Sequence, residues 1–110
     1  MTNDNNVEVI ELENEVTLKK PITFNNQEYR TLKLDLDKLT GQDIEDAELQ
    51  YTVRNPDLSA QTPMKDLSKG FQAIVAAKAA GLPVDVIKSM SASDYGKVTR
   101  MVQVFLLKGD

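Results

Sequence analysis

The sequence predicts an α+β fold in which an N-terminal β-hairpin, about residues 16–36, packs on a bundle of three to four α-helices. Three observations predict this fold class. Apolar and polar residues alternate on both sides of Asn25-Asn26, as in a hairpin. In the C-terminal part, apolar residues recur at helical spacing, and glycine, proline and capping residues divide them into separate helices. The helices are expected at about 41–53, 63–80, 84–90 and 92–107.

The composition favours one non-enzymatic domain. A length of 110 residues fits a single core, which we expect over residues 16–110. Residues 1–15 are rich in Asn and Glu and lack aromatic side chains, so a mobile tail is expected there. The chain has no cysteine and no histidine, which removes disulfides, thiolate nucleophiles and the commonest general base. We therefore expect no catalytic, cofactor-binding or metal-binding residue.

Charge and hydropathy indicate a soluble cytoplasmic protein. The chain carries 17 acidic and 13 basic residues, so it offers no basic surplus for nucleic acid or for anionic lipids. Its N-terminus lacks the basic start and apolar run of a signal peptide. No stretch approaches the roughly 18 apolar residues that a membrane span needs. We expect neither nucleic acid nor a membrane as a partner.

Parity predicts the register of the hairpin. A two-residue loop would put the leucines of the second strand on the face opposite Leu18. A three-residue loop, Asn25–Gln27, pairs Leu18 with Leu34 and Val16 with Leu36, which keeps the leucines on one side. Pro21 cannot donate to a ladder, so the first strand is expected to be an edge or to break there. The leucines concerned are Leu32, Leu34 and Leu36.

Capping signals mark the first two helices. Thr40 and Asp43 have the spacing of an N-cap residue and its N3 partner, and Asn55-Pro56 ends the run. Thr62-Pro63 places a cap and a first-turn proline before the second helix. The residues expected to face the core are Ile44, Ala47 and Tyr51 from the first helix, and Leu67, Phe71, Ile74 and Val75 from the second.

The last two helices are separated by similar signals. Gly81 can take the left-handed conformation that follows a helix, and Pro83 suits the first turn of the next one. Ser91 and Asp94 repeat the capping-box spacing ahead of the final helix. One stripe of that helix consists of Tyr95, Val98, Met101, Val102 and Phe105.

The end of the final helix is apolar on every side, because further apolar residues follow the stripe. Such a surface is either buried between hairpin and helices or reserved for a partner. If Tyr95, Val98, Val102 and Phe105 complete the core, other side chains remain available for binding. These candidate partner-binding residues are Met101, Val104, Leu106 and Leu107.

Charged clusters offer an alternative. Asp35 and Asp37, two apart on a strand, would point to one side and could hold a divalent cation. The segment that continues to Asp46 comes near a calcium loop, but Leu39 occupies a ligand position. A solvated strand face is the simpler explanation. Helix capping explains the cluster Asp43, Glu45, Asp46 and Glu48, and solvation explains the basic pairs Lys19-Lys20 and Lys97 with Arg100.

Taken in order, these segments resemble the tail assembly chaperones of long-tailed bacteriophages and prophages. The resemblance covers about residues 16–107. It rests on Leu39–Asp43, on the break Gly81-Leu82-Pro83, and on Ser93-Asp94-Tyr95 before the last helix. These are structural signatures and not catalytic motifs.

The resemblance implies a small non-enzymatic chaperone in the host bacterial cytoplasm, absent from the mature virion. It implies binding to the tape-measure protein and promotion of tail-tube polymerisation, with the tail-tube protein and a second copy of the chain as further candidate partners. A small acidic domain with an apolar helical groove suits such a role, because it could shield helical segments from aggregation. Two alternatives stay open: a tail completion or connector protein retained in the virion, and a carboxylate metal-binding domain.

Overall fold

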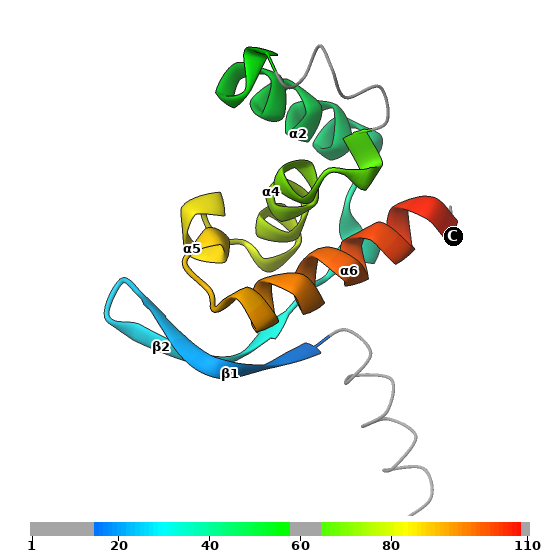
Figure 1. Cartoon of the computed structure of the whole chain (residues 1–110). Coiled ribbons are helices and arrows are strands. Elements are labelled where there is room, and N and C mark those ends of the chain that lie inside the picture. Colours follow the sequence, from blue (N-terminus) through cyan, green and yellow to red (C-terminus); the bar gives the residue numbers. More distant parts are fainter. Residues whose placement is uncertain (1–14, 58–64, 109–110) are drawn as a thin grey trace, which may run out of the picture.

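The computed structural model describes residues 15–57 and 65–108, and it confirms the predicted α+β class (Figure 1). The expected tail, up to residue 14, and Thr62-Pro63 lie outside the described residues. The strands β1 (Glu15–Phe24) and β2 (Gln27–Lys33) form an antiparallel hairpin. The helices are α2 (Gly41–Arg54), α4 (Lys69–Ala80), α5 (Val84–Lys88) and α6 (Ala92–Lys108), and two 3-10 turns are η1 (Leu36–Lys38) and η2 (Lys65–Leu67).

The hairpin closes through a two-residue loop, so the predicted three-residue loop is wrong. Asn25 and Asn26 have φ angles of 53° and 64°. A type I′ turn requires a positive φ at both central residues, and asparagine tolerates that conformation. Phe24 accordingly pairs with Gln27 directly across the loop.

A bulge in β1 restores the apolar face that this loop alone would split. The register shifts between Thr17 and Ile22, where four residues of β1 lie opposite one residue of β2. The register shift is three residues, an odd number, so the side chains in the first part of β1 change to the other face of the hairpin. Val16 pairs with Leu32 as a result. Pro21 lies inside this irregularity, so the pairing is interrupted at the predicted place, although β1 continues through it as one strand.

The strand β2 is shorter than predicted, because it ends at Lys33. The chain then turns toward the helices, and the backbone N–H of Asp35 donates to the carbonyl oxygen of Ala79 in α4 at 3.2 Å. The predicted pairs Leu18 with Leu34 and Val16 with Leu36 are therefore wrong. The predicted burial of these side chains is nevertheless confirmed: Val16, Leu18, Leu32, Leu34 and Leu36 are all buried.

The helix α4 lies at the centre of the molecule, with α2 on one side and α6 on the other, and the hairpin lies beyond α6 (Figure 1). Phe71 of α4 is fully buried and meets the Tyr51 ring edge-on, with centroids 6.3 Å apart. Gly70 permits this approach, since a Cβ there would lie 3.1 Å from Tyr51 Cε1. Ala47 and Tyr51 are buried as predicted, and Ile44 is half-buried.

Two predicted helix ends are confirmed atom by atom. Thr40 Oγ1 accepts a hydrogen bond from the Asp43 N–H at 3.2 Å, and Asp43 Oδ2 accepts one from the Thr40 N–H at 2.8 Å. These two bonds form the predicted capping box. Gly81 ends α4 with a φ of 72°, in the left-handed region.

Two helix boundaries differ from the prediction by more than one residue. Helix α4 begins after Ser68, whose Oγ accepts from the Phe71 N–H at 3.4 Å, and not at residue 63. Leu67 falls in η2 and is 51% exposed, so its assignment to the core is wrong. Helix α5 begins at Val84, as predicted, although Pro83 is its N-cap residue and not part of its first turn. Helix α5 ends at Lys88, two residues earlier than expected.

Candidate functional site

The start of α6 is attached to the bulge of β1. Ser91 Oγ accepts a hydrogen bond from the Asp94 N–H at 3.2 Å, as expected for an N-cap. The Asp94 carboxylate reaches across to the hairpin: Oδ1 accepts from the Lys19 N–H at 2.9 Å, and Oδ2 accepts from the Lys20 N–H at 3.1 Å. The bulge leaves these two donors without a place in the ladder, and the carboxylate satisfies them.

Asp94 is fully buried, with an exposed fraction of 0%. Burial by itself raises the pKa of this carboxyl, but the hydrogen bonds from Lys19, Lys20 and Ser91 and the nearby charge of Lys97 outweigh it. The pKa of Asp94 therefore lies below its ordinary value, and the group is ionised at neutral pH. The Asp94 carboxylate therefore holds the hairpin against α6, and its contacts do not suit proton transfer.

A second group of polar side chains lies between α4 and α6. Gln72 Nε2 donates to the carbonyl oxygen of Asp66 at 2.6 Å and to Gln103 Oε1 at 2.9 Å. The Tyr95 hydroxyl donates to the carbonyl oxygen of Lys69 at 3.2 Å, and burial raises the Tyr95 pKa. No buried side-chain nitrogen or oxygen of the described residues lacks a partner. These polar side chains therefore have a structural role in the contact between α4 and α6.

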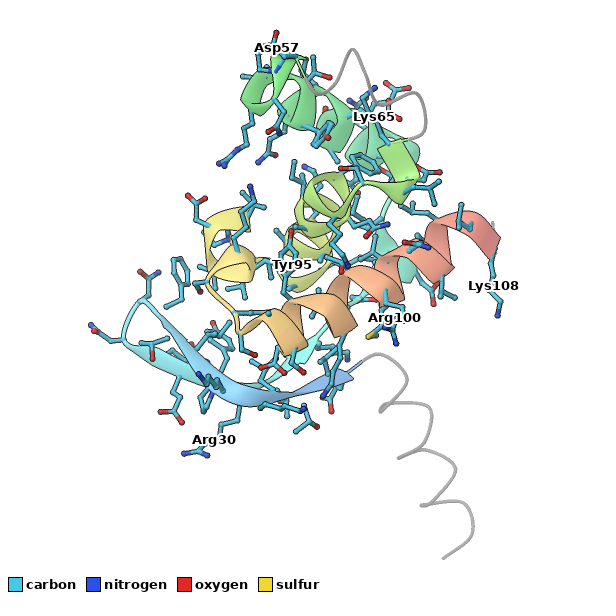
Figure 2. The ribbon with its side chains drawn as sticks, in the orientation of Figure 1. Arg30, Asp57, Lys65, Tyr95, Arg100 and Lys108 are labelled. Atoms are coloured by element: carbon cyan, nitrogen blue, oxygen red, sulfur yellow. The ribbon has the colours of Figure 1, made fainter. Side chains whose placement is uncertain are left out.

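The C-terminal half of α6 lines an apolar pocket. This cavity of about 290 Å³, here called the α6 pocket, is open to the surface. Val104 beside it is 48% exposed, and Leu107 one turn further along α6 is 51% exposed. Figure 2 shows Arg100 and Lys108 pointing outward from the same helix. The residues that line the α6 pocket are Leu36, Arg100, Met101, Val104 and Phe105.

The structure brings together only part of the predicted partner-binding set. Met101 and Val104 both line the α6 pocket, and Met101 is half-buried. Leu106 is half-buried against the core, and neither it nor Leu107 lines the pocket. Phe105, predicted as a core residue, is half-buried and lines the pocket as well.

Leu36 is the pocket residue that sequence reasoning missed. It was expected on a strand with Leu32 and Leu34, whereas it begins η1 and is buried beside α6. No local signal in the sequence could have shown this, because the position of η1 depends on where β2 ends.

A larger hollow of about 480 Å³ is lined by residues from the hairpin tip, from α2, from α4 and from the turn between α4 and α5. Phe24 comes from the hairpin, Gln50 from α2, Lys78 from α4 and Leu82 from the turn. Lys78 is the one ionisable residue among the side chains that line it in the described chain. A single lysine without a convergent acid or base offers no catalytic arrangement.

The predicted carboxylate pair does not form on a strand. Asp35 follows the end of β2 and is half-buried, while Asp37 lies in η1 and is exposed. Asp43 serves the α2 capping box, and the hydrogen bond from the Thr40 N–H lowers its pKa. Within residues 15–57 and 65–108, no group of three or more potential ligands could hold a metal ion.

The basic pairs are exposed, as expected for solvated residues: Lys19, Lys20, Lys97 and Arg100. Lys19 and Lys20 have a structural role through their backbone N–H groups, which bind Asp94. The Arg100 side chain forms no hydrogen bond or ion pair with another residue that the structure describes. Within the described part of the chain, its guanidinium therefore stays unpaired at the edge of the α6 pocket.

Comparison with known proteins identifies the family. No helix in the described part of the chain is long and apolar enough to cross a membrane. No match was found among curated proteins or among solved structures. Residues 15–107 match the family described as phage tail assembly chaperone proteins, E, or 41 or 14. This match runs from the first residue of β1 almost to the end of α6, and the chain therefore belongs to this family of phage tail assembly chaperones.

Proposed function

We propose that this tail assembly chaperone binds the tape-measure protein through the α6 pocket and so promotes polymerisation of the tail-tube protein. One observation carries the proposal. Apolar side chains remain exposed on the C-terminal half of α6 after the core is complete, with Val104 and Leu107 about half exposed. Exposed apolar surface next to a cavity is typical of a protein-binding site.

The α6 pocket suits the side chains of a helical segment. Its volume of about 290 Å³ lies at the lower end of the roughly 300–1,000 Å³ of ligand pockets, so it fits a few apolar anchors. An amphipathic helix presents such anchors at spacings of three and four residues. Met101 in the pocket wall has a flexible thioether that adapts to different anchors. A chaperone that contacts many sites along one long protein needs that adaptability.

The one charged side chain in the wall of the pocket, among the described residues, is positive, although the chain as a whole has a formal charge of −4. Arg100 lines the pocket, and Lys97 and Lys108 are exposed on the same helix. Complementary charges favour the correct partner and speed its association. The preferred segments of the tape-measure protein are therefore apolar on one face and acidic beside it.

The direct test combines Val104→Ser with Leu107→Ser and measures co-purification with a tagged tape-measure protein. Both side chains are about half exposed, so the double variant is expected to fold with an unchanged circular dichroism spectrum and to lose the complex. A matched control is Leu49→Ser with Val53→Ser on α2, where the side chains are 64% and 72% exposed. Retained binding by the α6 variant would refute the α6 pocket as the binding site.

We also propose that the protein acts in the host bacterial cytoplasm and is absent from the mature virion. The support is its membership of a chaperone family, whose members assist assembly. Mass spectrometry of purified virions tests this directly, with the tail-tube protein as the internal positive control. Stoichiometric retention in the particle would instead identify a tail completion or connector protein.

A further inference from the structure

The outer side of α2 carries apolar residues that the rest of the described chain leaves uncovered. Leu49 and Val53 are 64% and 72% exposed, more than any other large apolar residue that the structure describes. They are four residues apart and so lie on one side of the helix. The surface that we call the α2 stripe lines a shallow hollow of about 440 Å³ and consists of Asp46, Leu49, Gln50, Val53 and Arg54.

The α2 stripe has opposite charges at its two ends. Asp46 and Arg54 are eight residues apart, or about 12 Å along the helix axis. Gln50 lies midway between them. A twofold axis at Gln50 would therefore place Asp46 of each copy level with Arg54 of the other. The same arrangement would bring Leu49 and Val53 of both copies together around the axis.

We propose that two copies of this chain associate through an antiparallel, twofold-symmetric contact between their α2 stripes. The surface is self-complementary in charge, and its apolar residues lie between the charged ends. Such a surface fits a second copy better than an unrelated partner. In one symmetric contact, the pair between Asp46 of one copy and Arg54 of the other forms twice, once on each side of the axis.

Both charged groups keep hydrogen-bonding capacity for this contact beside the partners they already have. Asp46 Oδ1 accepts from Gln42 Nε2 at 2.9 Å, and no described residue donates to Oδ2. Arg54 Nη1 lies 3.5 Å from Asp85 Oδ1, in an ion pair whose side chains are 41% and 77% exposed. An exposed pair of this kind is weak, and the guanidinium has five N–H donors to share.

The association is expected to be weak and to depend on concentration. A contact between one helix of each copy buries less than the roughly 1,200 Å² of a stable interface. The dimer therefore dissociates in dilute solution and forms where copies are crowded together. Helices α2 and α6 lie on opposite sides of α4 (Figure 1), so dimerisation leaves both α6 pockets open. If the proposed function holds, each dimer offers two tape-measure sites, and binding gains from bivalence.

Sedimentation velocity of the full chain, from about 10 µM to about 1 mM, tests the dimer. The wild type is expected to shift from monomer to dimer over this range. Asp46→Arg and Arg54→Asp should each weaken association at least tenfold, because like charges then meet across the axis. Combining the two exchanges the charges and should restore association. Glu48→Arg makes the same charge change as Asp46→Arg at an exposed position outside the stripe, and it should have little effect.

The apolar part of the contact has its own test. Leu49→Ser with Val53→Ser should abolish the dimer, while the tape-measure complex still forms at the α6 pocket. Val104→Ser with Leu107→Ser should do the reverse, so the two proposals fail independently. A wild type that stays monomeric to about 1 mM would overturn the dimer, and so would a combined charge exchange that fails to restore it. Loss of association in the α6 variant would also overturn it, by moving the contact to α6.

Discussion

Two helices of this protein begin with the same sequence pattern and use it differently. Thr40 and Asp43 close a capping box between residues three positions apart at the start of α2, and the bonds are exposed to solvent. Ser91 and Asp94 have the same spacing at the start of α6, but the carboxylate binds β1, 75 and 74 positions away in the sequence. One acid stabilises a helix end, whereas the other joins two parts of the fold.

The comparison shows how the hairpin acquires its register. The bulge of β1 removes the Lys19 and Lys20 N–H groups from the ladder, and Pro21 has none to offer. Asp94 is the acceptor that the described residues supply to these two donors. The buried carboxylate and the bulge therefore depend on each other, and together they bring Val16 opposite Leu32.

The largest expected effect is that of Asp94→Ala. Two backbone N–H groups lose a charged acceptor, and hydrogen bonds to charged groups contribute about 1.5–3 kcal/mol each. We expect a loss of about 3–6 kcal/mol in the free energy of unfolding, measured by urea titration at pH 7. Thr40→Ala, which removes the exposed cap of α2, should cost only about 0.5–2 kcal/mol. Equal losses would show that Asp94 is no more than a local cap.

The pH dependence of stability separates the charge of Asp94 from its shape. The pKa of Asp94 is lower in the folded chain than the roughly 3.9 of an unfolded one. Its contribution is therefore fully present above that unfolded value and is lost as the pH falls through the folded pKa.

The matched variant is Asp94→Asn, which resembles the protonated acid. The difference in unfolding free energy between wild type and variant should be largest near pH 7 and should shrink below about pH 4. Urea titrations at pH 7, 5, 4, 3 and 2 measure it. A difference that stays constant over this range would mean that geometry and not charge holds the hairpin.

The starts of α2, α5 and α6 could be predicted because their signals are local, whereas α4 begins at Lys69 and not at residue 63. The bounds of α2 and α6 differ from the prediction by one residue at most. The register of the hairpin could not be predicted in the same way. Parity correctly required an odd offset, but the chain places it in a bulge that Asp94 supports and not in the loop at Asn25.

The sequence could predict which residues of the candidate binding surface are apolar, but not which of them are exposed. Helical spacing placed Met101 within the apolar stripe of α6, and further apolar residues follow outside it: Val104, Leu106 and Leu107. Which of them remain exposed depends on where η1 and β1 lie against α6, and this follows from long-range contacts. Leu36 therefore joins the α6 pocket without a local signal, while Leu106 packs against the core.

The smallest expected effect concerns the exposed acids at the start of α2. Asp43 is already engaged by Thr40, and the described residues contain no group of three or more potential ligands for a metal ion. A ligand stabilises the folded state by RT ln(1 + [L]/Kd), so millimolar Ca²⁺ or Mg²⁺ should change the Tm by less than about 1 °C. Differential scanning fluorimetry with NaCl at equal ionic strength controls for screening of the surface charges. A Tm that rises with either divalent cation but not with NaCl would mean that these acids bind a metal. The start of α2 would then be a metal site, whereas Asp94 at the start of α6 holds the hairpin.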